Sequence, residues 1–134
     1  MERPMSQPRA EAVMQSYLTQ VLSDRKFELI TEFAADNMVD HTQPERGPAA
    51  LEAHARRFCD NITDLEITVE RIFATDDTAV GIWRWSGTPI QSWGVSASGE
   101  AIYPRIIASI FRLEDDMVVD YQVFVDAVDV ATQL

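Results

Sequence analysis

The chain has 134 residues, which is the size of one domain, because domains usually hold roughly 100–200 residues. Its composition, 46% hydrophobic and 25% charged, is typical of a chain that folds around an apolar core. The 22 acidic side chains outnumber the 11 basic ones and give a net charge of −11. We therefore expect no nucleic acid and no anionic membrane among its partners.

Cysteine and histidine are scarce in this sequence. A single cysteine, Cys59, allows no internal disulfide, and two histidines leave few ligands for a metal ion. We therefore expect no metal ion. The sequence has no apolar run of about 18 residues and no cationic leader followed by an apolar stretch, which predicts a cytoplasmic protein.

The N-terminal part of the chain is predicted to be helical after a short arm. Residues 1–9 hold two prolines and no periodicity, and they predict a flexible arm before a single domain over residues 10–134. Apolar residues between Val13 and Leu22 recur with helical spacing and predict the first helix. A second, shorter helix follows Asp24 as its N-cap and ends in the polar stretch 35–37.

A third helix and a series of strands follow. Gly47-Pro48 predicts the start of this helix, because proline at the first helical position loses no hydrogen bond. Beyond it the apolar period changes to 2, and residues 65–69 alternate as in a strand with one wet face. After a turn at Asp76-Asp77, two central strands are predicted over residues 78–86 and 102–113.

The segment between those two strands, residues 87–100, predicts a loop that folds over the mouth of a pocket, with Trp93 on it. A turn at residues 114–116 leads into a last strand over residues 117–125. A short tail, residues 128–134, ends the sequence.

Three helices followed by a mainly antiparallel meander predict an α+β domain in which the helices cover one face of a curved sheet. Such a sheet encloses a cone, whose inward side chains make a pocket for a small apolar molecule. Trp83 and Trp85 lie two residues apart on one face of their strand. They leave more apolar sheet than three short helices can cover, which predicts a homodimer.

Several short motifs stand in a characteristic order along the chain: Met38-Val39-Asp40-His41, Gly87-Thr88, Ile110-Phe111-Arg112-Leu113-Glu114-Asp115, Asp126-Ala127 and Gln133-Leu134. With the order of elements, they resemble the SnoaL-like polyketide cyclase family of the NTF2-like superfamily, from Ala12 to Leu134. The resemblance implies an NTF2-like cone and a cofactor-independent cyclase that closes a ring by intramolecular aldol condensation. Branches that look alike include ketosteroid isomerases, limonene epoxide hydrolases, scytalone dehydratases and non-catalytic binding modules.

The resemblance also indicates where catalytic groups would lie. The cyclase pattern has an acid/base aspartate in the final strand, where this chain has Val123, and a histidine where it has Ser109. In the isomerase pattern, a tyrosine of the first helix corresponds to Tyr17, and His41 stands in place of the carboxylate base. An imidazole can fill that role near neutral pH.

Alternation along the last two strands places Arg105 and Ser109 on the inner face, together with Tyr121 and Val123. Burying the charged guanidinium of an arginine on the inner face of an apolar strand costs free energy unless an acidic group or a ligand pairs with it. Arg105 is therefore expected to be either a ligand contact or part of an ion pair. His54 lies on the inner stripe of the third helix, and we expect it to be a packed or dimer-facing histidine.

Two functions remain open. In the first, the protein is a cofactor-independent enzyme that acts by proton transfer on a small, largely apolar, oxygen-bearing molecule, with His41 as acid/base and Arg105 and Tyr121 holding the oxygen. In the second, it is a non-catalytic ligand-binding or assembly module. The predicted substrate contacts are Tyr17, Trp85, Trp93, Ser109, Val123 and Asp126.

Overall fold

The computed structural model describes residues 8–91 and 105–125 of the chain. Its N-terminal helix, α1 (Arg9–Ser16), continues directly into a π-helical segment, η1 (Tyr17–Ser23). A short 3₁₀ segment, η2 (Phe27–Glu32), follows, and α2 (Pro48–Asp60) comes after the first strand. The three predicted helical regions are therefore confirmed, although the first and second depart from regular α-helix geometry.

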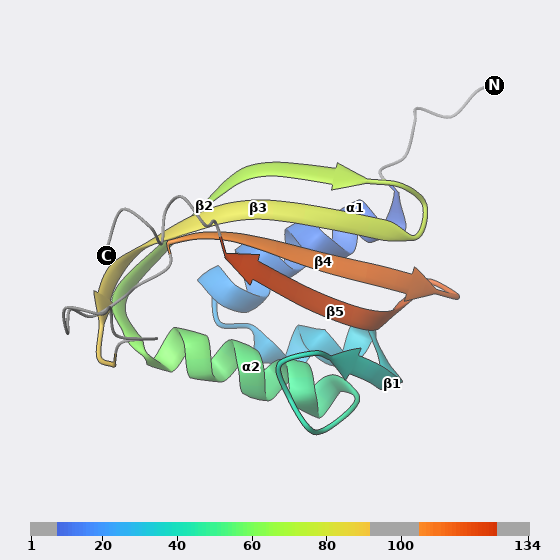
Figure 1. Cartoon of the computed structure of the whole chain (residues 1–134), viewed down its shortest axis with the longest axis horizontal. Coiled ribbons are helices and arrows are strands. Elements are labelled where there is room, and N and C mark those ends of the chain that lie inside the picture. Colours follow the sequence, from blue (N-terminus) through green and yellow to red (C-terminus); the bar gives the residue numbers. More distant parts are fainter. Residues whose placement is uncertain (1–7, 92–104, 126–134) are drawn as a thin grey trace.

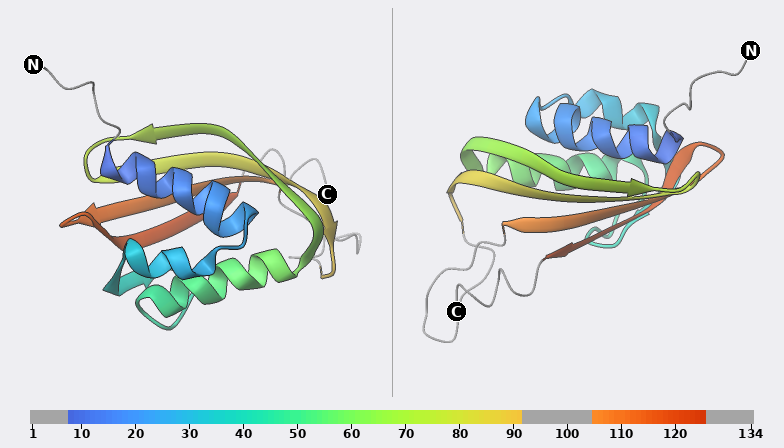
Figure 2. Two further views of the ribbon diagram at one scale, coloured as in Figure 1. Left: turned by 180° about the vertical axis from the view of Figure 1, so that it is seen from behind. Right: turned by 90° about the horizontal axis from the view of Figure 1, so that it is seen from above.

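Five strands form one curved sheet in the order β1-β5-β4-β3-β2. β1 pairs with β5 in parallel, and the other neighbours are antiparallel. Figure 1 shows β2 and β3 bending across the molecule, and Figure 2 shows the helices gathered on one face of the sheet. The predicted α+β architecture is confirmed. The strands are β1 (Ala34–Asp40), β2 (Ile62–Ala74), β3 (Thr78–Pro89), β4 (Ile106–Glu114) and β5 (Met117–Val125).

β1 corrects the sequence prediction. The second helix was expected to run to residues 35–37, and all helices were expected to precede any strand. Instead, η2 ends at Glu32 and β1 joins the edge of β5 before α2 begins. The hydrogen bonds of β1 are completed by a strand far along the chain, so local propensity could not reveal it.

α2 begins where the sequence predicts, with Gly47 as N-cap and Pro48 at the first helical position. Gly47 has a φ of 87°, and its N–H donates to the carbonyl oxygen of Met38 at 2.8 Å. A Cβ at this position would lie 2.6 Å from the carbonyl oxygen of Asp36. The start of α2 is therefore seated directly on β1 at a position where only glycine fits without strain.

β3 runs three residues beyond its predicted end at residue 86, and β4 begins at Ile106. Residues 92–104, which hold most of the predicted pocket loop, lie outside the described residues, as do residues 1–7 of the arm and the tail beyond residue 125. The turn predicted at residues 114–116 is confirmed as a tight hairpin, with positive φ at Asp115 and Asp116.

Trp83 and Trp85 are buried, and both rings meet Phe58 of α2 edge-on. The apolar surface from which a homodimer was predicted is thus covered by α2. The homodimer stays a prediction, without support from these two side chains. Within residues 8–91 and 105–125, no helix has both the length and the apolar character needed to span a bilayer.

Candidate active site

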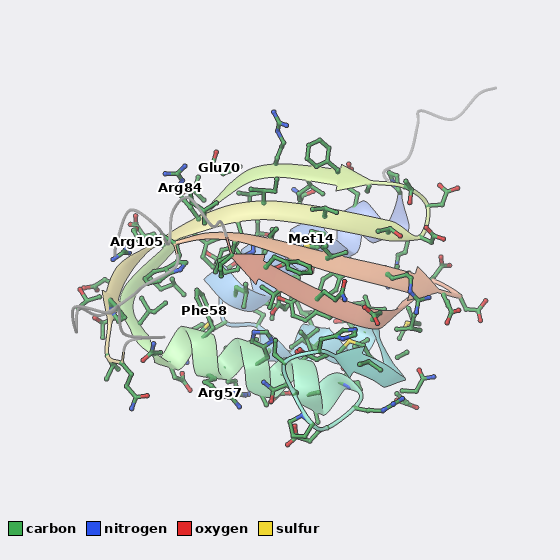
Figure 3. The ribbon with its side chains drawn as sticks, viewed as in Figure 1. Met14, Arg57, Phe58, Glu70, Arg84 and Arg105 are labelled. Carbon is green, nitrogen blue, oxygen red and sulfur yellow. The ribbon has the colours of Figure 1, made fainter. Side chains whose placement is uncertain are left out.

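A cavity of about 710 Å³ lies between α2, η1 and the inner face of β3, β4 and β5. Figure 3 shows Phe58 projecting from α2 toward the sheet, where its ring forms part of the wall. The volume falls in the range of sites for small organic molecules. The apolar wall includes Leu22, Phe58, Trp83, Ile107 and Val123, and the polar residues around it include Gln43, Arg57, Asn61 and Gln91.

A buried aspartate and a histidine meet at one wall of this cavity. Asp40, the last residue of β1, is fully buried, and its Oδ2 lies 2.8 Å from Nδ1 of His54 on α2. Its Oδ1 accepts hydrogen bonds from the backbone N–H and the hydroxyl of Thr42, at 2.9 and 2.7 Å. Because the carboxylate holds the hydrogen on Nδ1, Nε2 of the neutral imidazole is left as a base. His54 lines the cavity and its side chain is 22% exposed.

The environment of Asp40 keeps it charged. Burial by itself raises the pKa of Asp40, but hydrogen bonds from His54 and Thr42 outweigh burial and hold that pKa below its usual value. Asp40 is therefore ionised near neutral pH. In this form its carboxylate can accept the hydrogen bond that orients the imidazole of His54.

Two phenols form the neighbouring wall. Tyr17, the first residue of the π-helical segment η1, packs edge-on against Tyr121 of β5, with 5.8 Å between the ring centroids. The ring centroids of His54 and Tyr121 are 5.5 Å apart, so one ligand can touch both side chains. Burial raises the pKa of Tyr121 to about 12 and that of Tyr17 well above its usual value. Both phenols thus remain protonated and can donate hydrogen bonds.

Three residues predicted as site residues line the cavity: Tyr17, Tyr121 and Val123. Ser109 is fully buried behind Tyr121, with its Oγ 3.2 Å from the phenolic oxygen. Trp85 packs against Phe58 and is not one of the described residues that line the cavity. Trp93 and Asp126, also predicted as substrate contacts, lie outside the described residues.

His41 does not share the cavity with Asp40, although the two are adjacent. Asp40, the last residue of β1, points to the inner face of the sheet, whereas His41 follows the strand and contacts Asp120, which pairs with Val39 on the outer face. There its Nε2 lies 2.9 Å from Oδ2 of Asp120, and its side chain is 47% exposed.

Arg105 lies just before β4 begins (Figure 3), with its guanidinium carbon 4.5 Å from the centre of the Trp85 ring. The N–H of His41 donates to the carbonyl of Tyr121, which pairs with Phe111 of β4. Six residues of strand therefore separate the level of His41 from Arg105, or about 20 Å. The roles predicted for His41 and Arg105 stay predictions, and they no longer rest on a shared cavity.

Asp40 and His54 were not selected from the sequence. His54 carried a detectable signal, because it lies between Leu51 and Phe58 on the inward stripe of its helix, where a polar ring needs a partner. Asp40 carried no such signal, because it becomes buried only when β1 pairs with β5.

The described residues hold no cluster of three or more His, Cys, Asp or Glu side chains that could bind a metal ion. Cys59 is buried near the cavity and its Sγ donates to the carbonyl of Leu22 at 3.3 Å. Burial raises the pKa of the Cys59 thiol to about 11, so the reactive thiolate is scarce near neutral pH.

Comparisons with known proteins identify the family and agree with the fold. The SnoaL-like polyketide cyclase model matches residues 12–134. A search among curated proteins gave no match. A SnoaL-like polyketide cyclase from Agrobacterium tumefaciens is 16% identical, with a TM-score of 0.75 over 96% of this chain and 98% of the other. TsrD from Streptomyces laurentii is 19% identical, with a TM-score of 0.70 over 97% of both chains.

An epoxide hydrolase of the LEH-like type from M. tuberculosis is 14% identical, with a TM-score of 0.63 over 94% of this chain and 89% of the other. At these identities the structural likeness shows the fold alone. The family itself follows from the match to the family model, which spans residues 12–134. This protein belongs to the SnoaL-like polyketide cyclase family.

Proposed function

We propose that the protein is a cofactor-independent enzyme that moves a proton on a small, largely apolar molecule with a carbonyl oxygen. The observation that carries the proposal is the Asp40–His54 pair, 2.8 Å apart, at the wall of an apolar cavity beside Tyr121. A base of fixed tautomer and a neutral hydrogen-bond donor are the groups that enolisation requires.

The reaction begins when Nε2 of His54 takes a proton from the carbon next to the carbonyl. The electrons of the broken C–H bond form a carbon–carbon double bond, and the carbonyl π electrons move to the oxygen, to which Tyr121 donates a hydrogen bond. Asp40 stabilises the imidazolium that results. The enolate then either takes the proton back from His54 at another carbon, or its carbon attacks a second carbonyl of the same molecule and closes a ring. In the second case the π electrons of that carbonyl move to its oxygen, and the alkoxide takes the proton from His54, which restores the base. No co-reactant is consumed.

The family supports this class of chemistry, because a structural neighbour is described as a polyketide cyclase. The apolar wall built from Phe58, Trp83 and Ile107 supports a ring-containing substrate. In this assignment His54 takes the role that the sequence analysis gave to His41, and Tyr121 keeps the role predicted for it.

A second candidate is a non-catalytic binding module. It is favoured by Val123, which lines the cavity at the position where the cyclase pattern has its acid/base aspartate. In that case the cavity binds an apolar ligand, and His54 serves only to satisfy the buried Asp40.

Exchange of α-hydrogens for deuterium separates the two candidates. We expect the protein to accelerate this exchange in 1-indanone and in related small cyclic ketones and enones, followed by NMR in D₂O. His54→Gln keeps a polar side chain but removes the base, and it should lower the rate about 10²–10⁴-fold. The matched control is His41→Gln on the outer face, which should leave the rate unchanged.

Bound ketone without accelerated exchange would support the binding module and overturn the enzyme. If His41→Gln abolishes exchange while His54→Gln does not, the proton carrier is His41 and the assignment to His54 is wrong.

A further inference from the structure

Buried polar groups behind the cavity form a chain of two hydrogen bonds. Trp83 Nε1 donates to Ser109 Oγ at 3.1 Å, and Ser109 Oγ lies 3.2 Å from the Tyr121 hydroxyl. The indole, the serine and the phenol of Tyr121 each bring one polar hydrogen. Three hydrogens thus share two contacts, and one is left over. Its position decides what the cavity can bind.

The spare hydrogen does not belong to Trp83 or Ser109. The indole N–H can only donate, so it fills the first contact. Ser109 is fully buried, and its hydrogen-bond partners in the described part of the chain are Trp83 and Tyr121. The hydroxyl hydrogen of Ser109 therefore has the oxygen of Tyr121 as its acceptor, since a buried hydrogen without an acceptor is costly.

The spare hydrogen thus lies on Tyr121, whose side chain lines the cavity. Burial raises the pKa of Tyr121 to about 12, so the phenol keeps this hydrogen near neutral pH. The oxygen of Tyr121 then accepts from Ser109, and the hydrogen of Tyr121 is available to a ligand.

We propose that Tyr121 acts toward ligands as a donor only, so that the cavity prefers a carbonyl or enolate oxygen to a hydroxyl group. A hydroxyl also has an oxygen that accepts, but its hydrogen finds no acceptor on Tyr121. Ser109 is a positioning residue in this arrangement, because it occupies the oxygen of Tyr121 and acts only through it. The inference rests on the proposed function in that it needs this cavity to be the ligand site.

The test compares dissociation constants for 1-indanone and 1-indanol, measured through quenching of tryptophan fluorescence, since Trp83 lines the cavity. We expect the native protein to prefer the ketone by roughly fivefold or more. Ser109→Ala opens the oxygen of Tyr121 to the hydrogen of the alcohol, so the preference should fall toward one. Ser109→Thr keeps the hydroxyl and should restore the preference. His54 is present in the native protein and in both Ser109 variants, so any hydrogen bond that it accepts from the alcohol is the same in all three. A change in the preference for the ketone over the alcohol therefore reports on Tyr121.

A preference that persists in Ser109→Ala, or equal binding of both probes by the native protein, overturns this inference and leaves the exchange reaction at His54 standing. Binding of neither probe overturns the cavity as a ligand site, and with it both proposals. Because Ser109→Ala also leaves the buried indole N–H without its acceptor, a variant that keeps Ser109 provides a second readout. The infrared carbonyl band of bound 1-indanone should lie lower in the native protein than in Tyr121→Phe, and identical bands would overturn the proposal.

Discussion

Two histidine–aspartate pairs lie on opposite faces of one end of the sheet, and they differ far more in burial than in geometry. The nitrogen–oxygen distance is 2.8 Å for His54 and Asp40 and 2.9 Å for His41 and Asp120. In the inner pair the carboxylate is fully buried, whereas in the outer pair the aspartate and histidine side chains are 26% and 47% exposed. A short distance therefore does not identify a site.

Solvent access explains why the two pairs differ in what they can do. Water and ions screen the outer pair, so it contributes little to stability and leaves its imidazole open to solvent. The inner carboxylate has no contact with solvent and is held by Thr42, so the imidazole it orients faces the cavity in one tautomer.

Replacement of each aspartate by asparagine should give the largest contrast. In Asp40→Asn the new amide can donate to Nδ1 of His54, which moves the imidazole hydrogen to Nε2 and removes the base. We expect exchange in 1-indanone to fall about 10²–10⁴-fold and the free energy of unfolding to fall by about 2–4 kcal/mol. Asp120→Asn should leave exchange intact and change the unfolding free energy by about 0–1 kcal/mol in urea titrations. Equal losses in both variants would contradict the comparison.

The inner pair depends on how α2 is seated on β1, and Gly47 tests that dependence. Gly47→Ala combines a positive φ with a Cβ 2.6 Å from a backbone oxygen of β1, so it should lower the free energy of unfolding by about 1–3 kcal/mol. Exchange should fall as well, because His54 is carried by the displaced helix. The control is Gly81→Ala on β3, which has no positive φ and whose Cβ would meet side-chain atoms of Met14 and Leu18 at 2.8–3.0 Å instead of backbone; because side chains can shift, its stability loss should be smaller. If Gly81→Ala lowers the free energy of unfolding more than Gly47→Ala does, the contact between the start of α2 and β1 is not the reason for the sensitivity at Gly47.

The pH dependence of stability should report the inner pair. The pKa of Asp40 is lower in the folded chain than its usual 3.8, so the folded state binds fewer protons there than the unfolded state. The stabilisation is complete well above that value and is lost as pH falls through the lower folded pKa. Thr42→Val removes one hydrogen bond that lowers this pKa and should reduce the stabilisation by about 0.5–1.5 kcal/mol.

Urea unfolding measured from about pH 6 downward through the usual range of aspartate pKa values follows this loss of stabilisation. Thr42→Ser keeps the hydroxyl and serves as the control. Identical pH profiles for native protein and Thr42→Val would show that the hydroxyl does not hold the charge on Asp40.

The smallest effect is expected at the hairpin between β4 and β5, which lies away from the cavity. Asp115 and Asp116 have φ values of 50° and 65°, and glycine is preferred at the second position of such a turn. Asp116→Gly should raise the free energy of unfolding by about 0.5 kcal/mol without changing exchange in 1-indanone. A change in exchange in this variant would mean that stability, and not the inner pair, limits the reaction.

Features with local signals were predictable from the sequence. The apolar spacing from Val13 to Leu22, the Gly47-Pro48 helix start and the turn at residues 114–116 each depend on neighbouring residues alone, and the structure confirms them. Alternation along the last two strands also placed Ser109 and Tyr121 on the inner face, where the structure has them. The α+β fold was therefore within reach of sequence reasoning.

The sequence by itself determined the periodic elements and the α+β class, because each follows from the order of apolar and polar side chains. Only the tertiary structure decided which of the adjacent residues Asp40 and His41 faces the cavity. That choice depends on the parallel pairing of β1 with β5, a strand distant in sequence. This pairing places Asp40 beside Tyr121 on the inner face, where it meets His54, and leaves His41, just beyond the strand, beside Asp120 on the outer face.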